Sequence, residues 1–361
     1  MSSNQFYVNP DITLAETLPS SFYRDPMIFD QLKSIFLNSY HFIGDLSLVP
    51  LPGHTYPFVL LDSYLTEPML LVRNNDDQIN CFSNVCPHRG NIVVHNPGKA
   101  KSLQCMYHGR IFDLEGKFTR MPEFSDVKNF PRACDSLHKF DIKKLGPFLF
   151  CGLSNKYDFN TVLDEMNKKV SFLPLDEFLF NSSLSKDYLV NCHWALYCDN
   201  YLEGFHIPFV HPELNQVLDY GKYEVEIKER MTLQIGYAND GEEVFDLPKG
   251  HPDFGKNIAA YYFWIYPNMM FNFYPWGLSI NIVKPININK TKVSFLTYIY
   301  DESKFENSGA LLDKVEREDE FVVEGVTKGM QSSFYNTGRF SVKREDGVHY
   351  FHQLLSNDLK I

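Results

Sequence analysis

Apolar and polar positions repeat with different periods along the chain, and the first change of period falls near residue 40. Between Pro26 and Tyr40 the apolar residues recur every three or four positions, which predicts a helix. From residue 41 to about 153 the apolar runs are short, as at Met69–Val72 and Gly146–Gly152, and are separated by Gly, Pro, Asn and Asp. The pattern therefore predicts a helical leader over residues 1–40 and a small all-β domain over residues 41–153.

Beyond residue 154, helical and strand-like periods follow one another. The elements predicted there are a helix in a connecting segment at Asp158–Val170, a helix at Trp194–Phe209, strands at Glu224–Leu233, Ile258–Tyr266, Met269–Tyr274, Leu278–Pro285 and Lys292–Tyr300, and a helix at Ser308–Gln331. In the last helix, apolar residues from Leu311 to Val326 fit the helical period. Strands grouped between helices predict an α+β domain over 154–361, in which helices pack on an antiparallel sheet.

The most apolar stretch, Ile258–Leu278, is interrupted by Pro267, Asn268 and Pro275, and therefore predicts aromatic strands instead of a membrane span. The segment Met1–Leu18 has neither a basic start nor an apolar core, so no signal peptide is expected. Seven cysteines, an odd number, do not indicate a disulfide framework. A reducing cytoplasm is the expected location, with cysteines free to bind metal.

Composition excludes some classes of function but does not identify one. With 44% apolar and 22% charged residues, the 361-residue chain has the composition of a globular protein with a sizeable core. Its 31 Phe and 21 Tyr suit a deep apolar pocket, although an ordinary β-rich core is the commoner explanation. A net charge of −11 argues against a nucleic-acid partner. An acidic surface could dock a basic electron-transfer partner or simply favour solubility.

Two short motifs mix cysteine with histidine. Cys86 and His88 form a C-x-H pair, and after a spacer of sixteen residues Cys105 and His108 form a C-x-x-H pair. Each pair can present one thiolate and one imidazole, and a [2Fe–2S] cluster of the Rieske type takes two of each. Zinc accepts the same donors, but common zinc motifs pair Cys with Cys and His with His. The mixed pairs therefore favour the cluster.

A second set of metal-binding residues lies in the C-terminal half. His206 and His211 are five residues apart, which on a regular helix places them about 140° apart. Pro208 lies between them and predicts a break that could turn His211 back. Two histidines need a carboxylate to complete an iron(II) facial triad. The segment Glu316–Glu320 offers four acidic residues, and spacing alone does not choose among them; a solvated charged helix face is the simpler explanation of such a segment.

Together these motifs resemble a known family. C-P-H-R-G at 86–90, C-x-x-H-G at 105–109 and N-x-x-(D/E)-x-x-H-x4-H at 200–211 are similar to the signatures of Rieske non-haem iron oxygenase α subunits. That family includes ring-hydroxylating dioxygenases and choline-, betaine- and carnitine-type monooxygenases. The resemblance implies an N-terminal Rieske domain and a C-terminal helix-grip-type domain with an antiparallel sheet.

The resemblance also assigns roles by position. It implies that Cys86, His88, Cys105 and His108 hold the [2Fe–2S] cluster, and that His206, His211 and Asp319 hold the mononuclear iron. Glu203 matches an acidic residue that links a cluster histidine of one subunit to an iron histidine of its neighbour. Many members have Asp at this position, and Glu is more similar to amine-oxidising members. Asn200 matches an Asn of the family motif near the iron.

The same resemblance implies the cofactors and partners. Dioxygen is the co-substrate, and the cluster passes electrons to the iron. No Gly-x-Gly-x-x-Gly fingerprint follows a predicted strand, so NAD(P)H is expected to act only through a separate reductase, directly or by way of a ferredoxin. The family forms rings of three subunits, and a homotrimer is therefore expected.

The substrate is less well defined by the sequence. The predicted pocket residues are the aromatics of Tyr261–Trp276 together with Phe205 and Phe209. Such aromatics can hold an ammonium group by cation–π attraction, and the resemblance at Glu203 favours a small amine or quaternary ammonium. Ring hydroxylation of an apolar aromatic remains the alternative. An electron carrier without oxygenase activity and a zinc-stabilised binding protein are the other classes that the motifs allow.

Overall fold

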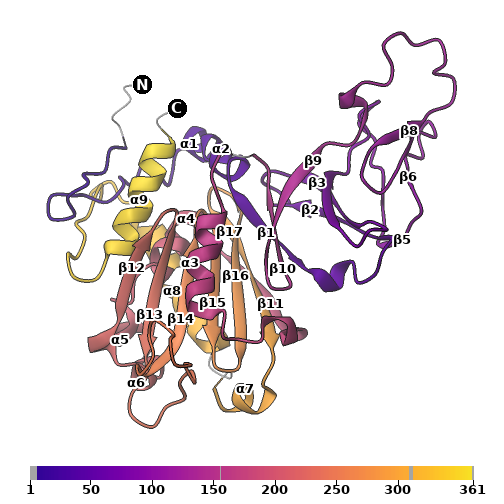
Figure 1. The fold of residues 1–361 in the computed structure, drawn as a ribbon. Helices are drawn as coiled ribbons and strands as arrows, with labels where there is room; N and C mark the ends of the chain where they lie inside the picture. Colours follow the sequence, from indigo (N-terminus) through magenta and orange to yellow (C-terminus); the bar gives the residue numbers. More distant parts are fainter. Residues whose placement is uncertain (1–5, 155, 309–311, 360–361) are drawn as a thin grey trace. The chain divides into compact units, whose positions relative to one another are not determined.

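The structure is a computed structural model that describes residues 6–154, 156–308 and 312–359 (Figure 1). The chain divides into two compact units. One consists of Leu37–Phe159, and the other combines Met1–Phe36 with Asn160–Ile361. The N-terminal segment thus belongs to the same unit as the C-terminal half of the chain.

The unit Leu37–Phe159 is built from short antiparallel strands, as the turn-rich sequence predicts. A seven-stranded sheet has the order β1-β10-β9-β4-β3-β2-β5, and a three-stranded sheet has the order β6-β7-β8. The strands are β1 Tyr40–Asp45, β2 His54–Leu60, β3 Glu67–Arg73, β4 Ile79–Ser83, β5 Gly98–Lys99, β6 Leu103–Gln104, β7 Ile111–Phe112, β8 Phe118–Arg120, β9 Lys139–Leu145 and β10 Phe148–Gly152. Buried Leu70, Phe82 and Phe112 form a core that includes Cys86 and Cys105.

The second unit contains a seven-stranded antiparallel sheet with the order β11-β17-β16-β15-β14-β13-β12. Its strands are β11 Leu179–Val190, β12 Glu224–Lys228, β13 Met231–Tyr237, β14 Ile258–Ile265, β15 Met269–Tyr274, β16 Gly277–Asn287 and β17 Lys290–Ile299. The predicted single strand Glu224–Leu233 is wrong, because the chain reverses at Arg230, whose φ is +53°, and continues as β13. Every residue of β13 is buried, so the sheet is covered on both faces there.

No strand was predicted at β11. It is an edge strand, paired only with β17 in the sheet, and most of its residues are exposed. Among its twelve residues only Tyr188 and Val190 are buried. An exposed edge strand needs no apolar alternation, and therefore leaves little signal in the sequence.

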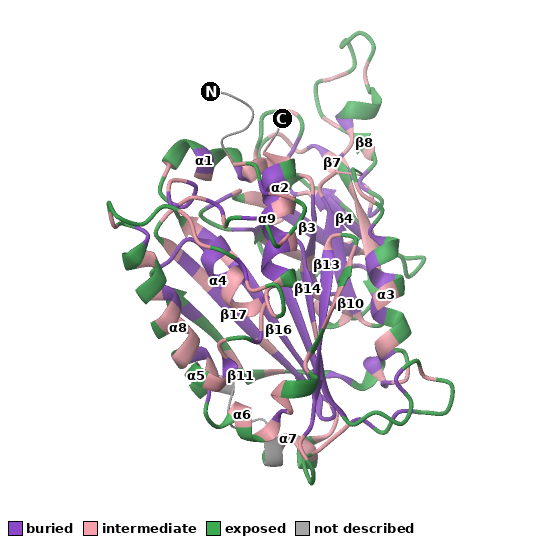
Figure 2. Ribbon diagram, turned by 90° about the vertical axis from the view of Figure 1, so that its left-hand side faces the viewer, coloured by how far each residue is buried: buried purple, intermediate pink, exposed green. Residues whose placement is uncertain are grey.

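Helices lie on both sides of the sheet. The helices of the described residues are α1 Pro26–Gln31, α2 Lys33–Leu37, α3 Asn160–Val170, α4 Trp194–Tyr201, α5 Ile207–Val210, α6 Leu214–Val217, α7 Glu302–Ser308, α8 Leu312–Gly329 and α9 Asp346–Asp358. Figure 2 shows α4 and α8 on one side of the sheet and α3 on the other, and α4 packs against both α8 and β16. No helix in the described ranges combines the length and apolar composition needed to cross a membrane.

The first and last predicted helices have other bounds in the structure, and one further helix was not predicted. The helix predicted at Pro26–Tyr40 ends at Leu37, and β1 begins at Tyr40. The last long helix, α8, begins at Leu312 and ends at Gly329; Ser308 belongs to α7, and the predicted position Leu311 lies outside the described residues. Helix α9 was not predicted, although it buries residues at helical spacing, Val348, Phe351 and Leu355.

Candidate active site

The two cysteine–histidine motifs form loops of the same geometry. The N–H of Gly90 donates to the carbonyl of Cys86 at 2.9 Å, and the N–H of Gly109 donates to that of Cys105 at 3.0 Å. Both glycines have positive φ, +72° and +69°, a conformation that side chains with a Cβ disfavour. Each glycine therefore closes a tight loop around its metal-binding pair.

The loops place the cysteines inside and the histidines towards the surface. Cys86 and Cys105 are buried, whereas His88 and His108 are half-buried, with ring centroids 4.7 Å apart. Burial raises the pKa of the Cys105 thiol, but the Tyr107 backbone N–H and other hydrogen bonds outweigh it and lower that pKa. Burial and the neighbouring His108 lower the pKa of His88. Burial raises the pKa of the Cys86 thiol. Two cysteines and two histidines are the donor set that a Rieske cluster requires, so these residues fit it.

The two histidines of the second set flank a single helical turn. Helix α4 ends at Tyr201, so the predicted helix Trp194–Phe209 is wrong. His206 is the N-cap of α5 and His211 is its C-cap. Pro208 does not break the helix; it occupies the first turn of α5, where proline is well tolerated. The break precedes His206, and it allows both imidazoles to turn towards α8.

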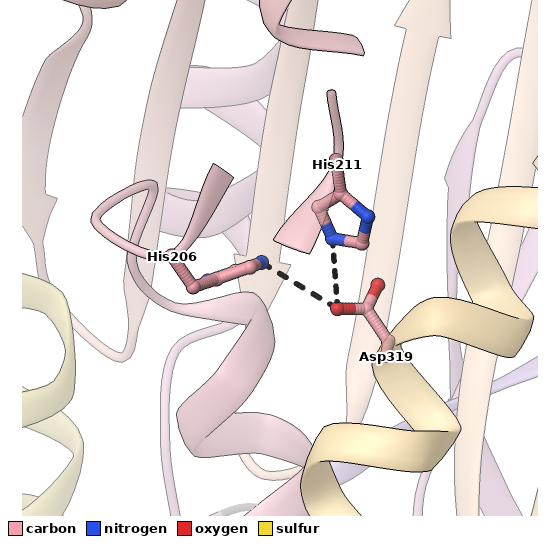
Figure 3. Close-up of side chains that lie close together, drawn as sticks. All are labelled: His206, His211 and Asp319. Carbon is pink, nitrogen blue, oxygen red and sulfur yellow. Dashed lines mark hydrogen bonds and ion pairs between the residues drawn. The ribbon is translucent and has the colours of Figure 1, made fainter. Parts of the chain in front are cut away.

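Asp319 of α8 completes a three-residue cluster (Figure 3). Its Oδ1 lies 3.0 Å from Nε2 of His211 and 3.5 Å from Nε2 of His206. The three potential ligand atoms lie within 4.8 Å of one another. Two imidazoles and one carboxylate converging in this way fit the facial triad of a mononuclear iron(II) centre.

The outer nitrogens of both imidazoles are bound by carboxylates. Nδ1 of His206 lies 2.7 Å from Oε1 of Glu203, and Nδ1 of His211 lies 2.8 Å from Oε2 of Glu318. The amide of Asn200 donates to Oδ1 of Asp319 at 2.6 Å. Such partners orient metal ligands and make imidazole a stronger donor. The sequence offered Glu318 as one of four acidic candidates for iron ligation, whereas the structure places it against His211.

Charge is concentrated in this cluster. Burial lowers the pKa of His206, but hydrogen bonds to Asp319 and Glu203 outweigh it and raise that pKa to about 9. Burial also acts to raise the pKa of Asp319, yet hydrogen bonds from His206 and His211 hold it at about 2. The site therefore favours a positive charge beside the ionised carboxylate of Asp319. A bound divalent cation would supply that charge.

A cavity of about 270 Å³ adjoins the cluster and is lined by His206, His211 and Asp319. Of the predicted pocket residues, Tyr262, Tyr274 and Trp276 line it. Alternate residues such as Tyr261 and Phe263 face away from it, as strand geometry requires. Phe205 and Phe209 are outside the lining and are 41% and 78% exposed.

The cavity also has a polar floor that sequence reasoning missed. The Tyr201 hydroxyl donates to Oδ1 of Asn272 at 2.6 Å, and Oδ1 of Asn281 accepts from Ser279 at 3.2 Å and from Asn272 at 3.4 Å. Other lining residues that were not predicted include Tyr197, Tyr223, Gln234, Glu242 and Glu243. The sequence did contain a signal for these residues, namely polar side chains within apolar strands. A buried amide is stable only where it finds hydrogen-bond partners.

Comparison with known families agrees with this architecture. The profile of the ring-hydroxylating α subunit (catalytic domain) matches residues 179–359, and that of the Rieske [2Fe–2S] domain matches residues 58–131. Choline monooxygenase of Arabidopsis thaliana is 30% identical over 377 aligned residues, covering 98% of this chain and 86% of that protein. The carnitine monooxygenase oxygenase subunit of Escherichia coli K12 is 26% identical, covering 98% of this chain and 99% of that protein.

Solved structures show the same fold. The quaternary ammonium Rieske monooxygenase CntA superposes with a TM-score of 0.78 at 22% identity, covering 99% of this chain and 98% of that chain. Naphthalene 1,2-dioxygenase from Rhodococcus sp. superposes with a TM-score of 0.71 at 14% identity, covering 95% and 94%.

The chain belongs to the family of Rieske non-haem iron oxygenase α subunits. It is an oxidoreductase: the oxygenase component of a system with a [2Fe–2S] cluster and a mononuclear iron, which consumes dioxygen and electrons delivered by a reductase.

Proposed function

We propose that this enzyme monooxygenates a small quaternary ammonium or amine compound. The observation that carries the proposal is the lining of the cavity. Its aromatic members are Tyr197, Tyr201, Tyr223, Tyr262, Tyr274, Trp276 and Phe295. Aromatic faces attract cations by about 0.5–2 kcal/mol each. The names of the choline and carnitine monooxygenases that the chain is similar to support the same substrate class.

The charges around the cavity indicate which kind of cationic substrate it would bind. Glu242 and Glu243 line the cavity, and no Lys or Arg is among its lining residues within the described chain. A substrate that carries a carboxylate would find no Lys or Arg there, whereas a cation with a neutral tail would be matched. The polar floor at Asn272, Ser279 and Asn281 offers hydrogen bonds to a hydroxyl or carbonyl on such a tail.

The proposed ligands follow from the geometry. Cys86 and Cys105 with His88 and His108 would hold the cluster in the domain predicted over 41–153. His206, His211 and Asp319 would hold the iron in the domain predicted over 154–361, and iron in such a triad supplies the activation of dioxygen. Glu203 and Glu318 hold the imidazoles by Nδ1, and Asn200 holds the Asp319 carboxylate. The protein thereby fixes three donors and leaves the cavity side for dioxygen and substrate.

We also propose that the enzyme is a homotrimer in which the cluster of one subunit faces the iron of the next. Apolar side chains are exposed in both units: Phe209 is 78% and Phe321 82% exposed near the iron ligands. Met106 and Tyr107, between Cys105 and His108, are 75% and 58% exposed. Exposed apolar residues around both metal sites suit a subunit interface. Glu203, already bound to His206, would bridge that interface to a cluster histidine.

We also propose an electron donor and a cellular location for the enzyme. The proposed donor is a separate reductase, acting directly or through a ferredoxin, and NAD(P)H would bind there. The seven cysteines are all free in the structure, which suits a reducing compartment such as the cytoplasm.

A substrate panel tests the proposed function. The loaded enzyme, with a suitable reductase, would be supplied with choline, carnitine or naphthalene under isotope-labelled dioxygen. We expect choline-like compounds to be oxidised with one labelled oxygen atom, carnitine to be a poorer substrate, and naphthalene to give no product. A naphthalene dihydrodiol carrying two labelled atoms, without oxidation of any ammonium compound, would overturn the proposal in favour of ring hydroxylation.

A further inference from the structure

Helices α4 and α8 are joined by two hydrogen-bonded pairs, one helical turn apart. Asn200 of α4 donates to Asp319 of α8 at 2.6 Å. Three residues earlier on both helices, the Tyr197 hydroxyl lies 2.5 Å from Oε2 of Glu316. Residues three apart lie on the same face of a helix, so both pairs face each other across one seam. The first pair orients a proposed iron ligand, whereas the second pair has no role in the site described above.

Glu316 is an acid buried without a counter-charge. It is 2% exposed, and among the described residues its Oε1 has no hydrogen-bond partner. Arg317, the next residue, turns away: its guanidinium binds Glu320 at 2.8 Å and lies over the ring of Tyr188. A buried carboxylate lacking a cation is unfavourable, so the carboxyl keeps its proton.

The surroundings act on the Glu316 carboxyl in both directions. Burial raises the pKa of Glu316 well above its usual range and the negative charges of Asp319 and Glu320 add to this effect, whereas the hydrogen bond from Tyr197 and the charge of Arg317 lower that pKa by less. The other titratable groups near Glu316 are Tyr197 on α4 and Cys192 before that helix, both with raised pKa values, and Tyr188 on β11. Neither the two tyrosines nor Cys192 carries a positive charge that would stabilise the ionised form of Glu316.

Glu316 and Tyr197 both line the cavity that His206, His211 and Asp319 line. The family's reaction needs protons there: a substrate C–H bond, dioxygen, two electrons and two protons yield a C–OH group and water. We propose that Glu316 and Tyr197 form a proton-donating pair that supplies one of these two protons. The Tyr197 O–H bond breaks as its proton passes to the oxygen atom that leaves as water. The Glu316 proton moves to the Tyr197 oxygen, and solvent then reprotonates the carboxylate.

A Gln at position 316 separates this role from a structural one. Gln has the same shape and can still accept from Tyr197, but it carries no transferable proton. We expect Glu316→Gln to retain iron and cluster content and to lose the infrared carbonyl band of a buried carboxylic acid. The single-turnover rate should fall at least tenfold, and its solvent isotope effect should change. Glu316→Asp should recover part of the rate.

Glu320 provides the matched control. It lies one turn further along α8, has an oxygen that is buried without a partner among the described residues, and is outside the cavity lining. Glu320→Gln should retain both the carboxylic-acid band and the single-turnover rate. If Glu316→Gln does not fold, Tyr197→Phe tests the same pair and should give the same loss of rate with the band retained. An unchanged rate and isotope effect in the folded variant, or a carboxylic-acid band that survives Glu316→Gln, would overturn the proposal.

Discussion

The amide nitrogen of Asn200 lies 2.6 Å from Oδ1 of Asp319, the same oxygen that faces Nε2 of both His206 and His211. One side chain of α4 therefore fixes the carboxylate around which the whole cluster is organised. Asp319 lies 119 residues from Asn200 along the chain. The packing of α8 against α4 and α5 brings it to the histidines.

Replacing Asn200 with Ala should weaken iron binding. Asp319 would lose the hydrogen bond that fixes its orientation, and removing an outer partner of a metal ligand typically costs about 10–100-fold in affinity. Iron retained after dialysis against graded chelator would measure the loss. The visible spectrum of the [2Fe–2S] cluster is the internal control and should stay unchanged. Iron retention equal to that of the parent protein would show that Asn200 has no orienting role.

Replacing Glu203 with Gln should slow electron delivery without removing iron. Gln keeps one hydrogen bond to Nδ1 of His206 but removes the negative charge proposed to bridge two subunits. Rapid mixing of the reduced enzyme with dioxygen and substrate would follow cluster reoxidation, for which we expect at least a tenfold lower rate. Glu318→Gln, which alters the corresponding bond to His211, is the matched comparison and should leave that rate closer to the parent value. Equal rates in parent and Glu203→Gln would contradict the bridging role.

Iron binding should depend on pH through the histidines. His206 has a pKa raised to about 9 in the metal-free protein, above its ordinary value of about 6.5, so below pH 9 iron must displace a proton from it. The apparent affinity for iron(II) should therefore rise about tenfold per pH unit between roughly 6.5 and 9 and then level off. The raised pKa also means that protonated His206 stabilises the folded, metal-free protein. This stabilisation is complete below the pKa of the histidine in the unfolded chain and is lost as the pH rises through about 9. An iron affinity that stays flat over this range, measured by anaerobic titration, would contradict the assignment.

The unpredicted helix α9 should be essential for stability. Phe351 is fully buried and contacts the rings of Trp194 and Trp264, so Phe351→Ala should lower the free energy of unfolding by about 3–5 kcal/mol. Phe334, which is fully exposed, is the matched control, and Phe334→Ala should change it by less than about 0.5 kcal/mol. Chemical denaturation of both variants would measure the difference, and similar values for the two would show that α9 is not packed as described.

The parts of the site that depend on local sequence could be predicted, whereas those that depend on contacts between distant residues could not. The cysteine–histidine loops are each closed within five residues, so their geometry follows from local motifs with glycine at the turn. The polar floor could not be predicted, because Asn272 and Asn281 come from neighbouring strands whose shared face depends on register. Spacing alone could not choose among Glu316, Glu318 and Asp319, since the direction each faces depends on how α8 packs; only the family resemblance singled out Asp319.

The same distinction between local sequence and tertiary contacts applies to the prediction of the fold. Strands with alternating or continuous apolar residues, such as β14 and β15, were predicted close to their true positions. Edge strand β11 was missed because its residues are mostly exposed. The end of α4 at Tyr201 was missed because Leu202, Phe205 and Phe209 continue the helical spacing of apolar residues. Tertiary contacts decided both cases, and a periodic pattern does not record them.

Iron counting is the most direct test of two separate metal centres in one chain. The purified, reconstituted protein should contain three irons per chain, and His206→Ala should contain two while the cluster spectrum stays unchanged and turnover is lost. Two irons in the parent protein, or disappearance of the cluster spectrum in His206→Ala, would contradict the account.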